Sequence, residues 1–94
     1  MSTSTILVID DSATIRKMVD SHLSQEGYRV VLAQNGEIGI QMAREIKPDL
    51  ILLDHQLPGT TGLEVCKKIL QFAECQNIPF VVSSTLRKQA YIEY

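Results

Sequence analysis

The sequence predicts an α/β fold in which helices cover both faces of a doubly wound parallel sheet. Two observations predict this fold. Short apolar runs rich in β-branched residues alternate with segments of helical periodicity, and the runs are apolar on both sides, as strands buried on both faces are. The chain has 94 residues, which is enough for one small domain that we expect to span residues 1–94.

A strand and a helix are expected at the start of the chain. Residues 5–9, TILVI, form the first apolar run. Ser12 can then cap a helix, and Gly27 can end it in the left-handed conformation. The face of this helix that turns toward the sheet is predicted from the apolar residues that recur at helical spacing, which are Ile15, Met18, Val19 and Leu23.

The same alternation continues along the rest of the chain. Pro48 ends the second helix, because proline lacks an amide hydrogen and moves the preceding residue out of the helical region. The remaining elements are expected as a strand at 28–33, a helix at 37–46, a strand at 49–54, a loop at 55–62, a helix at 63–73, a strand at 78–84 and the start of a fourth helix in 85–94.

Composition and charge exclude several classes of partner. A formal net charge of -2 gives no electrostatic case for nucleic acid or an anionic membrane. No apolar run is long enough to span a bilayer, and the first residues are too polar for a signal peptide, so we expect a cytoplasmic location. The two cysteines do not have the spacing of a zinc site. Three basic pairs are interpreted as solvated helix faces: Arg16-Lys17, Lys67-Lys68 and Arg87-Lys88.

Aspartates and hydroxyl residues stand where the predicted strands end. They are Asp10 and Asp11 after the first strand, Asp54 at the end of the third, and Ser83, Ser84 and Thr85 at the end of the fourth. The binding site of a parallel sheet lies beyond the carboxyl ends of its strands. If the first and third strands are neighbours, these side chains converge on one crevice. One strand-end aspartate is often only a helix cap, but capping does not explain a set at two strand ends.

Three aspartates in one crevice require a compensating cation or a raised pKa. At about 5 Å and an effective dielectric of about 20, two carboxylates repel by about 3 kcal/mol. Oxygen ligands in an acidic pocket favour Mg²⁺ or Mn²⁺, and the open metal positions suit phosphoryl transfer. Asp54 is the preferred nucleophile because a buried strand holds it, which leaves Asp10 and Asp11 as metal ligands. The Ser84 hydroxyl could then bond a phosphoryl group on Asp54.

From about Thr5 to Tyr94, the sequence resembles the receiver domain of bacterial two-component response regulators. The resemblance is carried by LVIDDS, by PDLILLD ending at Asp54, by Pro58 and Gly62, and by IPFVVSS. It implies a flavodoxin-like fold with strand order 2-1-3-4. It also implies that a histidine kinase or phosphotransfer protein phosphorylates Asp54, which switches a protein-binding surface. Such a domain is a phosphoacceptor rather than an enzyme, with self-catalysed phosphotransfer and dephosphorylation at most.

The resemblance also assigns roles to individual residues. It implies that Mg²⁺ or Mn²⁺ is held by the carboxylates of Asp10, Asp11 and Asp54 and by the backbone carbonyl of Gln56. Ser84 matches the switch hydroxyl, because it stands five residues after Pro79. Thr85 is the second choice for that role.

The resemblance further implies that the chain is truncated within helix four. The family has a fifth strand, which carries a catalytic lysine, and a final helix, and both are expected to be missing here. Lys88 is interpreted as a solvated helical residue, so no catalytic lysine is expected in this chain. The open edge of the fourth strand, beside the apolar run FVV, favours a dimer or an exchange of segments. A receiver-like interaction module that is not itself phosphorylated is therefore the alternative function.

Two further classes of protein fit the residues less well. A phosphohydrolase of the haloacid-dehalogenase type needs a second aspartate at the position of Gln56. A flavodoxin-like cofactor binder needs a loop after the first strand whose amides cradle phosphate, whereas DDSAT presents negative charge there. His55 is interpreted as a rim residue, because it points away from Asp54 if the strand geometry continues. His22 is interpreted as an ordinary half-exposed histidine.

Overall fold

A computed structural model of the protein describes residues 3–83 and 91–93. Within these residues the main sheet has five strands in the order β2-β1-β3-β6-β7. The pairs β1–β2, β1–β3 and β3–β6 are parallel, which confirms the predicted doubly wound sheet and its strand order. The strands comprise Thr5–Ile9 (β1), Arg29–Ala33 (β2), Leu50–Asp54 (β3), Phe80–Ser83 (β6) and Tyr91–Glu93 (β7).

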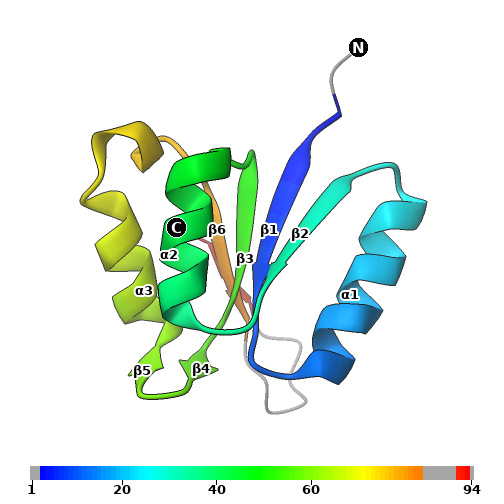
Figure 1. The fold of residues 1–94 in the computed structure, drawn as a ribbon, viewed down its shortest axis with the longest axis horizontal. Coiled ribbons are helices and arrows are strands. Elements are labelled where there is room, and N and C mark those ends of the chain that lie inside the picture. Colours follow the sequence, from blue (N-terminus) through cyan, green and yellow to red (C-terminus); the bar gives the residue numbers. More distant parts are fainter. Residues whose placement is uncertain (1–2, 84–90, 94) are drawn as a thin grey trace.

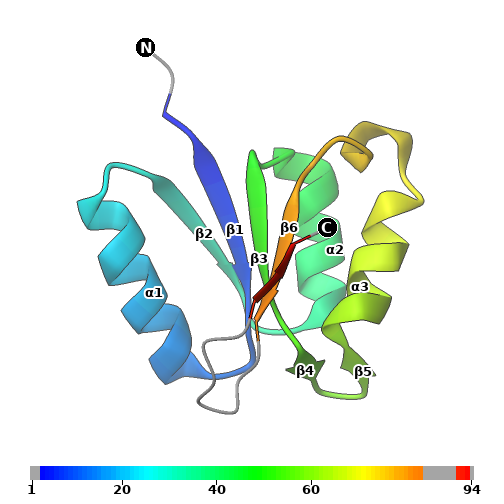
Figure 2. The same ribbon diagram turned by 180° about the vertical axis from the view of Figure 1, so that it is seen from behind.

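Helices cover both faces of the sheet, as expected. Helix α1 (Ala13–Gln25) lies on one face, and α2 (Gly36–Ile46) and α3 (Gly62–Leu70) lie on the other (Figure 1), as the opposite view also shows (Figure 2). A short 3-10 helix, η1 (Ala73–Cys75), follows α3, so the third helix ends earlier than the predicted residue 73. No helix among the described residues is long and apolar enough to cross a membrane.

Each of the three α-helices begins at a short polar residue that follows a strand. The Ser12 hydroxyl accepts a hydrogen bond from the N–H three residues later, at 3.2 Å, as predicted. Asn35 and Thr61 cap α2 and α3 in the same way, at 2.8 and 3.2 Å. Gly27 follows α1 with a φ of +95°, a conformation that favours glycine. These caps satisfy N–H groups at the helix starts and hold each start close to a strand end.

The hydrophobic core lies between the sheet and the α2–α3 face. Every second residue of a strand points toward this core, and the fully buried ones include Leu7, Ile9, Ile51, Leu53 and Phe80. Helix α1 buries no residue completely. Met18, predicted to face the sheet, has 49% of its surface exposed. The two faces of the sheet are therefore covered unequally, and the α2–α3 face carries most of the packing.

A small hairpin replaces the loop that was expected at residues 55–62. Strand β4 (Gln56–Leu57) pairs antiparallel with β5 (Thr60–Thr61). The two are joined by Pro58 and Gly59, and Gly59 has a φ of +73°. Proline followed by a glycine with positive φ is a favourable sequence for a tight turn. The hairpin follows directly from β3 at the lower edge of the sheet (Figure 1).

The helix predicted for residues 85–94 is wrong where the structure describes that segment. Tyr91–Glu93 form β7, which pairs antiparallel with β6 over Val81–Ser83. Residues rich in aromatic and β-branched side chains favour strands, and the backbone groups of the β6 edge need partners. Residues 84–90 and 94 lie outside the described residues. The β6 edge, expected to be open for a dimer or segment exchange, is thus paired by the same chain over these residues.

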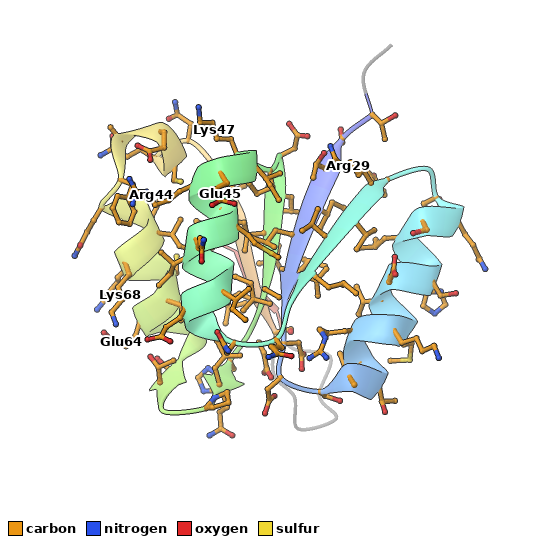
Figure 3. All side chains as sticks on the ribbon, in the orientation of Figure 1. Arg29, Arg44, Glu45, Lys47, Glu64 and Lys68 are labelled. Atoms are coloured by element: carbon orange, nitrogen blue, oxygen red, sulfur yellow. The ribbon has the colours of Figure 1, made fainter. Side chains whose placement is uncertain are left out.

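Arg44 joins α2 to the segment after α3 (Figure 3). Its Nε donates to Glu74 Oε2 at 3.1 Å, and its guanidinium carbon lies 3.9 Å from the centre of the Phe72 ring. Cys75, next in the chain to Glu74, is buried, and its Sγ donates to the carbonyl oxygen of Ala43 at 3.7 Å. Both cysteines, Cys66 and Cys75, are buried free thiols.

The difference in burial between two leucines predicts how much each contributes to the stability of the fold. Leu7 is fully buried in the core, whereas Leu63 has 38% of its surface exposed. We expect Leu7→Ala to lower the free energy of unfolding by about 2–5 kcal/mol, because it leaves a cavity in the core. The control, Leu63→Ala, should lower it by less than about 1 kcal/mol. Urea unfolding followed by circular dichroism measures both, and equal losses would contradict this description of the core.

Candidate functional site

The ends of β1 and β3 bring three carboxylates together. Ile9 of β1 is paired in register with Leu53 of β3, so the residues that follow them lie at the same edge of the sheet. Asp10, Asp11 and Asp54 each offer a carboxylate oxygen, and these three oxygens lie within 4.8 Å of one another. The convergence predicted from the strand order is confirmed for the three aspartates. We refer to these three residues as the acidic cluster.

Matching turns orient the two buried carboxylates. Asp10 is 4% exposed and Asp54 is 2% exposed. Oδ1 of Asp10 accepts the N–H of Ser12 at 2.9 Å, and Oδ1 of Asp54 accepts the N–H of Gln56 at 3.2 Å. Both are bonds from a backbone N–H to an aspartate two residues earlier, a local turn that aspartate favours. Each turn engages one carboxylate oxygen and leaves the other for a ligand.

The second oxygen of Asp54 has no hydrogen-bond partner in the part of the chain that the structure describes. Asp54 Oδ2 is buried and accepts no hydrogen bond within residues 3–83 and 91–93. A buried carboxylate oxygen normally has a hydrogen-bond donor or a cation beside it, because its desolvation is otherwise uncompensated. A ligand that brings positive charge would compensate this oxygen. The donor set of three carboxylates matches a hard divalent cation such as Mg²⁺.

Burial and the charges within the cluster raise two pKa values. Burial and, to a smaller extent, the charges of Asp10 and Asp11 together raise the pKa of the Asp54 carboxyl to about 6, against the opposing effect of the Gln56 N–H. Burial likewise raises the pKa of Asp10, opposed by the Ser12 N–H and by the Arg16 charge. The folded protein therefore disfavours the fully ionised cluster, and a bound cation would remove this cost.

Close packing holds the main chain of Asp54 beside the start of α3. A Cβ on Gly62 would collide with the carbonyl oxygen of Asp54, so this position requires glycine. The Gly62 N–H donates to the carbonyl oxygen of His55 at 2.8 Å, and the His55 N–H donates to the carbonyl oxygen of Ser83 in β6. His55 itself is exposed, in agreement with a rim position. The phosphoacceptor candidate thus lies on a rigidly packed segment.

The structure gives positions to some of the predicted site residues and not to others. Gln56 lies at the start of the hairpin, two residues from Asp54. Ser83 pairs in register with Asp54 across β3 and β6. The predicted switch residue Ser84, its alternative Thr85, and Lys88 lie outside the described residues.

Arg16 is a site residue that the sequence analysis missed. It was interpreted as part of a solvated basic pair, but its Nη1 donates to the backbone carbonyl oxygen of Asp10 at 2.8 Å. Long side chains on a helix point toward its N-terminus, and Arg16 lies in the first turn of α1. That direction, combined with the position of the Ser12 cap, was the signal available in the sequence.

Comparisons with known proteins agree on one family. A family model described as the response regulator receiver domain matches residues 6–93. Protein PilH of Pseudomonas aeruginosa is 35% identical over 80 residues, which cover 85% of this chain and 66% of PilH. The transcriptional regulatory protein AfsQ1 of Streptomyces coelicolor is 45% identical over 64 residues, which cover 68% of this chain and 28% of AfsQ1. The chain spans less than two thirds of the length of these two curated relatives.

Solved structures show the same fold. The chemotaxis protein CheY4 of Vibrio cholerae matches with a TM-score of 0.86 at 29% identity, over 93% of this chain and 72% of that chain. The response regulator protein TrrA of Thermotoga maritima, solved in complex with Mg²⁺ and BeF, matches with a TM-score of 0.82 at 30% identity. That match covers 90% of this chain and 72% of TrrA.

The raised pKa of Asp54 predicts how the protein's stability depends on pH without a divalent cation. Between pH 3.8 and about 6 the folded protein keeps a proton on Asp54 that the unfolded chain releases. The free energy of unfolding therefore falls as the pH rises through this window. Above the window, the folded protein bears the full cost of ionising the buried Asp54 carboxyl. Asp54→Asn removes this cost, so the variant should be more stable than wild type at pH 7 by about 1–3 kcal/mol.

Urea unfolding in EDTA at a series of pH values from 4 to 8 measures this difference. At pH 4 the two proteins should be close in stability, because Asp54 is then largely protonated in the folded state. Adding Mg²⁺ at pH 7 should stabilise wild type more than Asp54→Asn. A variant that is less stable than wild type at pH 7 in EDTA would contradict the electrostatic description of the cluster.

Proposed function

Because the chain belongs to the response regulator receiver domain family, we propose that it accepts a phosphoryl group on Asp54 from a phosphorylated histidine of a kinase or phosphotransfer protein. The observation that carries this proposal is the buried Oδ2 of Asp54, which has no partner in the described part of the chain and lies in a cluster of three carboxylates. The proposed domain is a stoichiometric acceptor and a switch, not a turnover enzyme.

The acidic cluster fits a divalent cation. Asp10, Asp11 and Asp54 would hold Mg²⁺ or Mn²⁺, and family resemblance adds the backbone carbonyl of Gln56. When bound, the cation neutralises the carboxylates and stabilises charge on the oxygens of the phosphoryl group. The complex of TrrA with Mg²⁺ and BeF supports the same metal in this chain. The unpartnered buried oxygen supports it independently.

The residues of this chain supply the nucleophile. Because the Gln56 N–H engages Oδ1, Oδ2 of Asp54 is the oxygen that attacks phosphorus. A bond forms between Oδ2 and phosphorus as the bond from phosphorus to the histidine nitrogen breaks. The leaving imidazole keeps that electron pair and takes up a proton. The attacking carboxyl must be ionised, and with a pKa of about 6 Asp54 is mostly ionised at pH 7.

The output of the proposed switch is a change of surface near the end of β6. Phosphorylation replaces the single negative charge of the Asp54 carboxylate with a phosphoryl group that carries about 1.5 to 2 negative charges, and it adds new hydrogen-bond acceptors. Ser83 pairs in register with Asp54, and Ser84 is the next residue in the sequence. We assign the switch role to the Ser84 hydroxyl, which would bond the phosphoryl group and move the segment that follows β6.

A cytoplasmic bacterial setting is part of the proposal. The kinase partner and the phosphoryl chemistry both belong to the cell interior. The buried free thiols of Cys66 and Cys75 fit a reducing compartment. The kinase partner, the cation and the regulated protein-binding surface are all proposals for this chain, which covers only part of its curated relatives.

Intact-mass analysis after incubation with acetyl phosphate and Mg²⁺ tests the phosphoacceptor. Wild type should gain the mass of one phosphoryl group, and Asp54→Asn should gain none, because the nucleophile is absent. Asp49→Asn is the matched control, since Asp49 precedes the opposite end of β3, and it should be phosphorylated like wild type. EDTA should abolish the reaction, because the cluster then lacks the cation that neutralises its carboxylates.

Two outcomes would contradict the proposal. An adduct that persists on Asp54→Asn would exclude Asp54 as the acceptor. No adduct on folded wild type would favour the alternative function, a receiver-like interaction module that is not itself phosphorylated.

A further inference from the structure

The side chain of Arg16 turns back from α1 to the end of β1. Its Nη1 donates to the carbonyl oxygen of Asp10 at 2.8 Å, while its own N–H donates to the carbonyl oxygen of Ser12 at 2.9 Å. Arg16 is half-buried, whereas the neighbouring Lys17 is exposed. The two basic residues of this pair therefore have different environments, and only Arg16 is hydrogen-bonded to the acidic cluster within the described residues.

The hydrogen bond from Arg16 is one of three that hold Asp10 in place. The Asp10 N–H donates to the carbonyl oxygen of Ala33 at 3.1 Å, and Asp10 Oδ1 accepts from Ser12. The carbonyl of Asp10 belongs to the planar peptide that links it to Asp11. Holding that carbonyl therefore sets the plane of the peptide and the direction in which Asp11 leaves β1.

Asp11 depends on this peptide for its position. It is exposed, and within the described residues its carboxylate makes no hydrogen bond. Its carboxylate nevertheless lies within 4.8 Å of the ligand oxygens of Asp10 and Asp54. Contacts among the described residues hold Asp10 and Asp54 directly, but they hold Asp11 only through the orientation of the main chain.

We propose that Arg16 is a positioning residue for the acidic cluster, because its hydrogen bond to the Asp10 carbonyl holds the peptide that directs the Asp11 carboxylate toward Asp54. The inference rests on the proposed function, since it concerns the same divalent cation site. It goes beyond that function because it assigns a role to a residue that is neither a metal ligand nor the nucleophile.

Charge and geometry make opposite predictions for Arg16. A guanidinium beside a cation site repels the cation, so an electrostatic role alone predicts tighter metal binding when the charge is removed. A positioning role predicts weaker binding, because the carboxylates are no longer held together. Residues that orient metal ligands typically change metal affinity by about 10–100-fold when they are replaced.

Titration of the full chain with Mn²⁺, followed by electron paramagnetic resonance of the free ion, separates the two roles. Arg16→Met keeps much of the side-chain length and removes the donor, and we expect it to bind Mn²⁺ about tenfold more weakly than wild type. Lys17→Met removes the same charge from the adjacent exposed position and should bind within about twofold of wild type or slightly more tightly. Arg16→Lys should recover part of the affinity, because an ammonium group also donates to a carbonyl.

The unfolding free energy of each variant in EDTA accompanies the titration. A merely structural role for Arg16 would lower stability and leave the Mn²⁺ affinity of the folded protein unchanged. Arg16→Met that binds Mn²⁺ as tightly as wild type, or more tightly, overturns the inference. If Arg16→Met does not fold, Arg16→Gln replaces it, because the shorter amide does not reach the same carbonyl, and normal affinity there overturns the inference equally. Wild type that binds no Mn²⁺ contradicts the proposed function instead.

Discussion

Repulsion among three carboxylates at one edge of a parallel sheet is the constraint on which the rest of the structure depends. Two of these carboxylates, Asp10 and Asp54, are almost completely buried, and the pKa of each is raised. A chain selected for stability alone would place neutral residues at these strand ends. The protein keeps the charges and leaves one buried oxygen of Asp54 without a hydrogen bond in the part of the chain described. That uncompensated oxygen is the physical basis of a site for a cation and a phosphoryl group.

The elements around the cluster restrict how it can relax. Caps at Ser12 and Thr61 begin α1 and α3 close to the ends of the strands that carry the aspartates. The β4–β5 hairpin and the contact between Gly62 and the Asp54 main chain leave β3 little freedom beyond its end. The two buried carboxylates, Asp10 and Asp54, therefore cannot separate without disrupting helix starts and strand pairing. A rigid acidic site that gains stability from its ligand is expected from this arrangement.

The sequence was sufficient for features that depend on local periodicity and strand order. Alternating apolar runs predicted β1, β2, β3 and β6. The family resemblance predicted that β1 and β3 are adjacent strands, which brings the aspartates together. Features that depend on distant partners were not predictable. β7 forms because it meets the edge of β6, and periodicity within Tyr91–Glu93 cannot reveal that pairing. Arg16 looked like a surface residue because its hydrogen bond goes to a main-chain carbonyl. Every residue has such a carbonyl, so the types of the neighbouring residues do not show which one Arg16 binds.

We expect Asp10, Asp11 and Asp54 to share one divalent cation. Amide NMR spectra recorded with substoichiometric Mn²⁺ test this expectation through paramagnetic line broadening. The amides of Ser12 and Gln56, which donate to the cluster, should broaden first, while Gly27, at the far end of α1, should be unaffected. Broadening centred elsewhere, or spread evenly over exposed acidic residues, would show that the three aspartates do not share a cation.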